Sequence, residues 1–457
     1  MQHPSTYGDP HNHPSLILGS AQSLPHRFFR LALVNILSNL TVPLAGLVSV
    51  GFLGHLGGIQ YLAGVTLATV LFNYLYRTLG FLRMSTTGLT AQAVGRNDRE
   101  AVLLTGLRNS LMALGLGALL LIFQHPIREF GFALLYATPE IKAAGQAYYN
   151  ARIWAAPATL LNFVIIGWLL GREQSGRVLL ISAIGNSMNV LLDYCFIVRW
   201  GWNSAGAGWA IGLSQYLMML IGIGLIIREL RWSEVRAVSA QIWNVAALKS
   251  TLSLNSNIFI RTLAFLSTFS IFTALSASID DILLAENALL LQVFTLAVYL
   301  IDGLAFATES LTGVLHGQGE KKPLLSLIGL AGSSSLIVGI TFASLFAVFP
   351  MPLFALLTNH MEVLSQIGQS VMWLVPILGF GSIAFMLDGY FLGLAEGATL
   401  RNAALVASLF GFAPIAVLAW QLRSSHLLWL ALAVFMAARA VLLSFQVPRT
   451  LSQDSSS

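Results

Sequence analysis

The sequence predicts an all-α membrane protein with twelve transmembrane helices in two pseudo-symmetric six-helix lobes. Of its 457 residues, 56% are hydrophobic and only 9% are charged, whereas about 25% of the residues of a soluble domain are charged. Apolar runs close to the roughly 20 residues that cross a bilayer follow one another along the chain. The second half also repeats the first at a constant spacing. The bilayer is therefore the expected solvent for most of this surface.

The apolar runs extend from Phe28 to Gln446 and are separated by short polar breaks. They predict spans at 28–53, 61–94, 101–123, 145–170, 177–198, 205–228, 250–275, 283–316, 324–349, 366–394, 400–421 and 427–446. The second and eighth are longer than the hydrocarbon core requires, so we expect them to tilt or to protrude from the membrane.

An internal repeat divides the chain into two lobes. Segment 88–95 (GLTAQAVG) reappears as 310–317 (SLTGVLHG), and 167–171 (GWLLG) reappears as 389–393 (GYFLG), so both pairs are separated by the same offset along the chain. An offset of six spans gives both halves the same membrane orientation, with a substrate cavity between them. The predicted organisation is a disordered tail at 1–26, an N-lobe with helices 1–6 at 27–228, a cytoplasmic linker at 229–249, a C-lobe with helices 7–12 at 250–446 and a C-terminal tail at 447–457.

The distribution of Lys and Arg predicts the orientation, because basic loops near helix ends are retained in the cytoplasm. With the N-terminus inside, the cytoplasmic breaks hold fourteen basic residues, and the opposite breaks hold only Arg128, Lys142, Arg199 and Arg423. We expect a multi-pass protein of a cell membrane, such as a bacterial inner membrane, with both termini cytoplasmic. The basic residues form no single stripe, so we expect no nucleic-acid partner.

Motifs for catalysis, ATP binding or metal chemistry are missing from the sequence. It has no Walker-type glycine-rich loop with its Lys, no HExxH, no GxSxG and a single cysteine. An intramembrane enzyme would need a nucleophile with a base, or a metal, at membrane depth. The candidate histidines instead map to span ends or loops: His55, His125, His316, His360 and His426. We expect no enzymatic activity, no metal and no cofactor.

Ionisable residues inside the predicted spans are the candidate functional residues, because each costs about 2.5–3.5 kcal/mol at a helix centre. Asp193, Asp302 and Asp388 lie deepest, and a short Asp side chain cannot reach the interface, so a functional role is favoured for these three. Snorkelling or a structural ion pair is favoured for residues nearer span ends. These are Arg83, Glu286, Glu309 and Arg439.

The fifth span carries a stripe of polar residues. Asp193 follows Asn186 by seven residues and Asn189 by four, so the three share one helix face. Two further positions are expected beside this stripe: Asn162 from the fourth span, and Ser214 or Gln215 from the sixth. A carboxylate with amide oxygens suits either a proton or Na⁺. The alternative is that each Asn only forms hydrogen bonds between helices.

A second polar cluster is predicted in the C-lobe. Asp302 and Glu309 are seven residues apart on one face of the eighth span, and Arg261 of the seventh span is a candidate counter-ion. Asp388 of the tenth span completes the cluster. The alternative is a static buried salt bridge that only fixes the packing of the lobes.

Segments from both halves together resemble one family of transporters. They are NILSNLTVPLAGLVSVGFLGHL from Asn35, GFLRMSTTGLTAQAVG from Gly80, GWLLG from Gly167 with GNSMNVLLDY from Gly185, DGLAFATESLTGVLHGQGE from Asp302 and LDGYFLGLAEGATLRN from Leu387. The similarity runs from about Arg30 to Arg439. The family is that of the multidrug and toxic compound extrusion (MATE) transporters, in its DinF-like branch.

The resemblance implies the MATE fold, a central cleft that opens alternately to either side, and export of drug-like or metabolite organic compounds in exchange for H⁺ or Na⁺. We expect a monomer in the lipid bilayer that acts on a small organic substrate. Plant members of the branch carry organic anions, so the branch does not fix the substrate's charge. The nearest alternative is a lipid-linked oligosaccharide flippase of a related two-lobe plan, which would need a wide basic cavity; the sequence offers few candidates beyond Arg77 and Arg261.

One position departs from the family pattern. The first helix of the family usually carries an Asp in a Gly-Leu-Val-Asp-Thr motif, where it belongs to the N-lobe cation site. This chain has GLVSV there, with Ser49 in place of the Asp. Three outcomes follow: Asp193 takes up the cation alone, coupling moves to the C-lobe cluster, or the protein is a weakly coupled facilitator.

Overall fold

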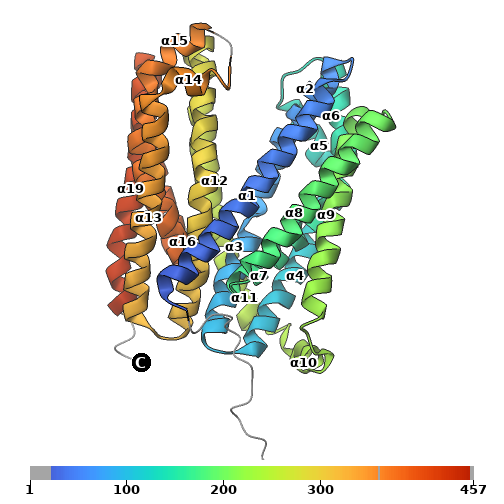
Figure 1. Ribbon diagram of the computed structural model, residues 1–457, viewed down its shortest axis with the longest axis vertical. Coiled ribbons are helices and arrows are strands. Elements are labelled where there is room, and N and C mark those ends of the chain that lie inside the picture. Colours follow the sequence, from blue (N-terminus) through green and yellow to red (C-terminus); the bar gives the residue numbers. More distant parts are fainter. Residues whose placement is uncertain (1–21, 359–360, 453–457) are drawn as a thin grey trace, which may run out of the picture.

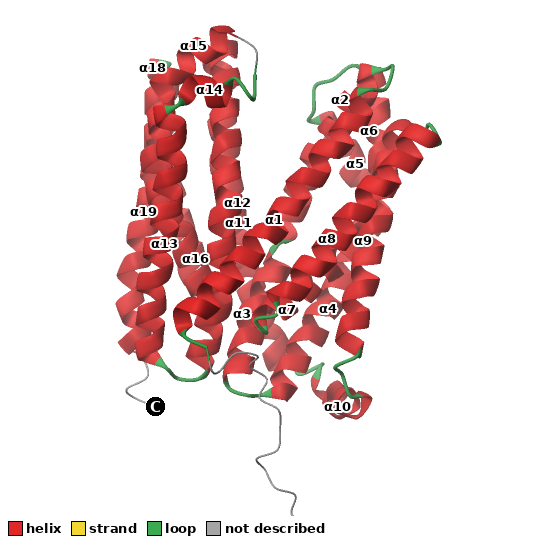
Figure 2. Cartoon of the chain, viewed as in Figure 1, coloured by secondary structure: helices red, strands yellow, loops and turns green. Residues whose placement is uncertain are grey.

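The fold is seen in a computed structural model, which describes residues 22–358 and 361–452. Those ranges contain helices and loops and no strand (Figure 2). Within these described ranges, twelve helical stretches are long and apolar enough to cross a membrane. They form two groups of helices side by side (Figure 1). The predicted fold class, a twelve-helix membrane protein in two six-helix lobes, is confirmed.

The N-lobe contains the first six spans, of which the second, fourth and fifth each consist of two or more helical segments. Its elements are α1 (Leu24–Gly54), α2 (Ile59–Leu79), α3 (Phe81–Gly95), α4 (Arg99–Ile122), α5 (Gln124–Ala133), α6 (Pro139–Arg152), η1 (Ile153–Ala155), α7 (Ala156–Gly171), α8 (Ser175–Asp193), η2 (Tyr194–Arg199) and α9 (Asn203–Ile227). The short helix α5 follows the third span and does not cross the bilayer.

The C-lobe contains the last six spans, and two short segments, α10 and η3, connect it to the N-lobe. These elements are α10 (Trp232–Val238), η3 (Ser239–Gln241), α11 (Val245–Ile279), α12 (Asp281–Gly317), α13 (Lys321–Val348), α14 (Pro350–Phe354), α15 (Met361–Ser370), η4 (Val371–Trp373), α16 (Leu374–Gly393), α17 (Gly397–Val406), η5 (Ala407–Phe412), α18 (Ala413–Leu422) and α19 (Ser425–Ser452).

The end helices extend beyond the predicted lobe boundaries. Helix α1 begins at Leu24, because Pro25 fits the first turn, where its missing N–H would have no helical partner. Helix α19 continues to Ser452, and the hydroxyls of Tyr390 and Thr450 lie 2.8 Å apart, which ties its last turn to α16. The remainder of the predicted tails, residues 1–21 and 453–457, lies outside the described residues.

Glycines of the two halves make equivalent helix contacts. A Cβ added to Gly171 would lie 2.6 Å from the carbonyl oxygen of Thr87, and one added to Gly393 would lie 2.5 Å from that of Glu309. Gly393 follows Gly171, and Glu309 follows Thr87, by the same offset that relates the repeated segments of the sequence. Helix α7 therefore packs on α3 as α16 packs on α12, so the repeat in the sequence is also a repeat of tertiary contacts.

The two lobes touch at a pair of equivalent glycines, Gly95 at the end of α3 and Gly317 at the end of α12. A Cβ on Gly95 would lie 2.9 Å from the Cα of Gly317, and the reverse distance is 3.0 Å. No side chain fits between these backbones. This contact lies at the end of the bundle that carries α10, where the helix groups converge, and they diverge toward the end that carries α14 and α15 (Figures 1 and 2).

Ion pairs tie the N-lobe to the segment that leads to the C-lobe. The carboxylate of Glu229, which follows α9, accepts a hydrogen bond of 2.8 Å from Arg172 Nη1 and also pairs with Arg177. Partial burial raises the pKa of the Glu229 carboxyl, but the hydrogen bonds and charges of these two arginines outweigh burial and lower the pKa below its usual 4.5. The ionised carboxylate therefore stabilises this end of the bundle.

Substituting Gly317 tests the contact between the lobes. We expect Gly317→Ala to lower the stability of the protein by about 1–3 kcal/mol, because the new methyl group overpacks a backbone contact. The matched control is Gly115→Ala in α4, where nothing lies within 4 Å and alanine is the better helix former. Thermal unfolding of the purified protein in detergent measures both. Equal stability of the two variants would show that the lobes do not meet at Gly317.

Acid should weaken the Glu229 ion pairs. A carboxyl with a lowered pKa stabilises the fold above its unfolded pKa, and this contribution is lost as pH falls through the lowered value. We expect Glu229→Gln to lower the melting temperature at pH 7, and this difference from wild type to shrink once the pH is below 4.5. The exposed Glu129 provides the control variant Glu129→Gln. A deficit that is the same at both pH values would contradict the assignment.

Candidate functional site

The acid of the N-lobe lies at the end of α8, fully buried, beside α1. Oδ2 of Asp193 accepts a hydrogen bond from Ser49 Oγ, and its Oδ1 has no hydrogen-bond partner among the described residues. Ser49 Oγ also lies 3.1 Å from the carbonyl oxygen of Ala45, one turn earlier in α1. No guanidinium pairs with Asp193 in the described part of the chain. The residue that replaces the family Asp thus directly contacts the remaining acid.

Three polar contacts connect α1 to α8 and form a polar seam. Ser38 Oγ donates to Ser182 Oγ at 3.2 Å, and Asn186 Nδ2 donates to Thr41 Oγ1 at 2.7 Å. The pair of Ser49 and Asp193 is the third contact. Asn186 therefore lies on the predicted stripe, but its amide N–H₂ is used to join two helices.

The side-chain amides of Asn162 and Asn189 differ in their hydrogen bonding. Asn162 Nδ2 donates to both the backbone carbonyl and Oε1 of Gln215, each at 2.9 Å, so this residue joins α7 to α9. Asn189 Nδ2 is buried and has no partner in the described ranges. The neighbour named from the sixth span is thus Gln215, and the interhelical role holds for Asn162 and Asn186.

In the C-lobe, Asp388 is held between two guanidiniums. Arg261 of α11 and Arg439 of α19 both pair with its Oδ2. Asp388 is 4% exposed and Arg439 1%. Arg261 thus forms its direct ion pair with Asp388 of α16 and not with Asp302 or Glu309, because its long side chain extends from α11 to α16. This triad fits the static structural alternative.

Glu309 pairs with the opposite lobe. Arg83 Nη1 of α3 lies 3.4 Å from Glu309 Oε2, and the guanidinium stacks 4.0 Å from the ring centroid of Phe306. Asp302, two turns earlier in α12, forms no ion pair within 4 Å in the described ranges. The predicted C-lobe cluster is therefore divided into a clamped Asp388, a pair between the lobes at Glu309, and a separate Asp302.

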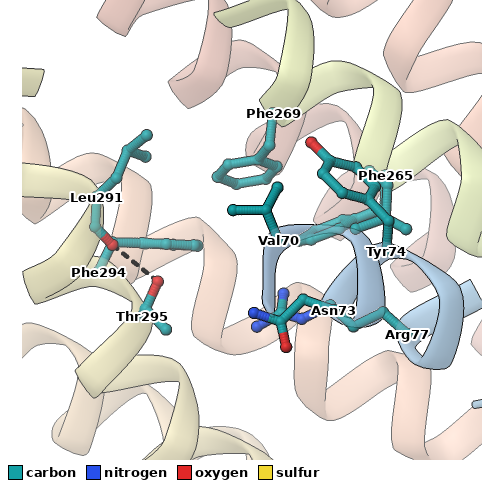
Figure 3. Close-up of a pocket in the computed structure, with 10 residues that line it drawn as sticks. Val70, Asn73, Tyr74, Arg77, Phe265, Phe269, Leu291, Phe294 and Thr295 are labelled. Atoms are coloured by element: carbon teal, nitrogen blue, oxygen red, sulfur yellow. Dashed lines mark hydrogen bonds between the residues drawn. The ribbon is translucent and has the colours of Figure 1, made fainter. Parts of the chain in front are cut away.

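A cleft of about 380 Å³ lies between the lobes. Helices α2, α3 and α7 supply one wall and α11, α12 and α16 the other, with Asp302 and Arg261 among the lining residues. A neighbouring hollow of about 260 Å³ continues between α2, α11 and α12. Figure 3 shows Asn73 and Arg77 extending from α2 into this space, opposite Phe294 and Thr295 of α12.

Polar contacts across the cleft come from several helices. Tyr74 OH of α2 lies 2.6 Å from Ser270 Oγ of α11, and Asn39 Nδ2 of α1 donates to the carbonyl oxygen of Tyr299 of α12 at 3.3 Å. Tyr74 borders the neighbouring hollow and Tyr299 the cleft. The described residues contain no cluster of three or more His, Cys, Asp and Glu side chains that could hold a metal ion.

The geometry defines a class of membrane protein: two six-helix lobes around a central cleft, with a buried acid in one lobe. Known proteins of this class match the chain closely. The MatE family model matches residues 35–195. DNA damage-inducible protein F of Escherichia coli is 33% identical over 419 residues, which cover 91% of this chain and 90% of that protein. A probable multidrug resistance protein NorM of Rhizobium meliloti is 25% identical and covers 88% of each chain.

Solved structures show the same fold. A multidrug resistance MATE family transporter of the MOP superfamily in an outward-facing conformation superposes with a TM-score of 0.85 at 20% identity, over 94% of this chain and 97% of that one. A MOP superfamily transporter from Pyrococcus furiosus gives 0.82 at 18% identity, over 94% and 96%. The chain belongs to the multidrug and toxic compound extrusion family, and it is a multi-pass membrane transporter.

The structural ion pair expected as one of two possibilities at Arg83, Glu309 and Arg439 is present at all three, but the sequence analysis did not name their partners. Arg439 lies in the interior and not near a span end, because helix α19 continues to Ser452. The repeat could have indicated Arg83: Glu309 is the repeat equivalent of Thr87, one turn from Arg83, and equivalent positions of a two-fold repeat can face each other near the axis.

Membership of a transporter family is consistent with the expectation that the chain is not an enzyme.

Removal of the Asp388 carboxylate tests the structural role of the triad. We expect Asp388→Asn to cost about 3–5 kcal/mol of stability, because it leaves two buried guanidiniums without a counter-ion. The control, Asp302→Asn, removes a carboxylate that forms no ion pair within the described ranges and should cost less. Thermal unfolding in detergent separates the two. If Asp388→Asn were as stable as wild type and lost only transport, Asp388 would be a coupling residue.

Proposed function

We propose that the protein exports organic compounds in exchange for protons by alternating access of the cleft, with Asp193 as the coupling acid. The observation that carries this proposal is a fully buried carboxyl group whose hydrogen-bond partner in the described residues is a hydroxyl and not a guanidinium. A guanidinium stabilises the ionised form of a carboxyl group and so opposes protonation. A hydroxyl can donate to the ionised form and accept from the protonated form, so both forms are possible beside Ser49. The name of the Rhizobium relative, a probable multidrug resistance protein, supports export of organic compounds.

Ser49 has one proton and two acceptors within reach, which gives the pair two arrangements. When Asp193 is ionised, Ser49 donates to the carboxylate. When Asp193 carries a proton, the acid donates to Ser49 Oγ, and the serine proton turns to the carbonyl oxygen of Ala45, 3.1 Å away. Uptake of a proton therefore changes a hydrogen bond on α1 itself. Ser49 thus provides a polar contact between α1 and Asp193 at the position where the family usually has an Asp.

Helix α1 is in a position to pass this change to the other lobe. It contacts α8 along the polar seam and contacts α12 through the hydrogen bond from Asn39 to the Tyr299 carbonyl. A ligand can only shift the two facing states if it binds them with different affinity. Proton uptake that alters how α1 packs between α8 and α12 meets this condition, because α12 forms a wall of the cleft.

A proton fits this site better than Na⁺. A hard metal ion takes several oxygen ligands. Within the described residues, the hydrogen bond that Asp193 accepts comes from Ser49, and the amide N–H₂ groups of Asn162 and Asn186 are directed to other helices, while Asn162 Oδ1 is buried without a partner. A proton needs one oxygen, and Oδ1 of Asp193 is unpartnered.

The orientation expected from the basic loops assigns the conformation. If the end that carries α10 is cytoplasmic, as its basic loops favour, the lobes meet on the cytoplasmic side at Gly95 and Gly317 and diverge toward the outside (Figure 1). The conformation is then outward-facing, the state in which a proton would enter and the exported solute would leave. We propose that both termini lie in the cytoplasm.

Transport by the purified protein in proteoliposomes with an imposed pH or Na⁺ gradient tests the coupling. We expect Asp193→Asn to abolish gradient-driven accumulation, because the amide cannot exchange a proton, while movement down the substrate's own gradient continues. Ser49→Ala should reduce coupling severalfold by removing the hydroxyl that donates to the acid. A pH gradient should drive transport in wild type and a Na⁺ gradient should not.

The control is Asp98→Asn, which replaces one good helix N-cap with another at the exposed start of α4. Unchanged coupling in Asp193→Asn would rule out the N-lobe site. A wild type that moves substrate only down its gradient, together with coupling restored by Ser49→Asp, would identify a facilitator.

A further inference from the structure

The cleft is lined by an excess of positive charge. Its lining includes three guanidiniums, those of Arg77, Arg83 and Arg261, and one carboxylate, that of Asp302. The buried groups directly behind the lining add the Arg439 guanidinium and the carboxylates of Glu309 and Asp388. The whole set is four guanidiniums against three carboxylates, so a solute in the cleft faces a net positive surface.

Of the three lining guanidiniums, Arg77 is the one without an ion-pair partner in the described part of the chain. Arg83 pairs with Glu309, and Arg261 pairs with Asp388. Arg77 forms no ion pair or side-chain hydrogen bond in the described part of the chain, and its side chain is exposed. It borders both the main cleft and the neighbouring hollow, and Figure 3 shows it extending into the space between α2 and α12. A guanidinium in this position is free to bind an acidic group of a solute.

Aromatic rings surround this guanidinium. Phe265 and Phe294 border both the cleft and the hollow, and Phe163 and Phe306 border the cleft alone. Ring faces and edges bind flat apolar groups, and a volume of about 380 Å³ lies in the range of small-molecule sites. A lipid-linked oligosaccharide would need a wider basic cavity than this one.

We propose that the cleft binds aromatic organic anions, with Arg77 holding the carboxylate, sulfonate or phosphate group and the phenylalanines holding the ring system. This rests on the proposed export function and names its substrate class. Arginine binds planar acidic groups through two parallel N–H donors, which gives orientation as well as affinity. A cationic solute of the same shape would face three guanidiniums and find one carboxylate, Asp302, that is free of an ion pair.

Two dyes with the same ring system and opposite charge test the proposal: carboxyfluorescein, an anion, and rhodamine 123, a cation. Fluorescence anisotropy gives the affinity of each for the full-length protein in lipid nanodiscs. We expect wild type to bind carboxyfluorescein more tightly. Arg77→Gln should weaken that binding about tenfold, since a charged hydrogen bond contributes on this scale. Arg77→Lys should retain most of the affinity, and Arg77→Glu should reverse the preference in favour of rhodamine 123.

The control is Arg128→Gln, a residue outside the cleft that contacts Glu129 and Asn150 and should leave both affinities unchanged. Tighter binding of rhodamine 123 by wild type, or carboxyfluorescein binding that Arg77→Gln leaves unchanged, overturns the proposal. Thermal unfolding of each variant separates a loss of binding from a loss of folding.

Transport of the same dyes distinguishes this proposal from the export function itself. Proton-driven movement of rhodamine 123 that is insensitive to Arg77 would overturn the anion site and leave the export function standing. Binding of carboxyfluorescein through Arg77 without proton-driven movement would support the anion site and contradict the exchange. If the folded protein binds neither dye, the anion site is overturned.

Discussion

An ionised side chain inside a membrane bundle needs a partner, because the hydrocarbon offers neither water nor ions to stabilise it. Most of the buried charges in this protein obey that constraint through arginine: Asp388 lies between two guanidiniums, and Glu309 pairs with Arg83 across the lobes. Asp193 is different, since its described partner is the hydroxyl of Ser49. The first two acids are held by arginine, and the third is not, which is the basis of the coupling role proposed for it.

The two lobes share the same helix contacts but differ in their buried ionisable residues. Glycines in equivalent positions hold α7 against α3 and α16 against α12. The acid site does not repeat: the repeat equivalents of Ser49 and Asp193 are Ile271 and Ile415. Duplication thus supplies the symmetric framework that a two-sided cleft needs. The N-lobe holds a buried acid with a hydroxyl partner, while the C-lobe holds a buried acid between two guanidiniums.

The cleft joins these features, since its walls come from both lobes. Arg83 and Arg261 form ion pairs with carboxylates behind the wall, and Arg77, which lines the same cleft as Asp302, forms none within the described residues. Helix α1 touches α8 at the acid and α12 at the cleft. One helix therefore contacts both the buried acid and a wall of the cleft.

The sequence by itself determined the twelve spans, the two-lobe repeat and the family, because hydrophobic length and a constant offset between repeated segments are properties of the linear chain. It also located Asp193 and Ser49, and it is the tertiary structure that brings them into contact. Only the tertiary structure decided which arginine holds which acid. Arg261 and Asp388 are 127 residues apart and Arg83 and Glu309 are 226 apart, and such pairs depend on how helices rotate and cross, which side-chain spacing within one helix does not specify.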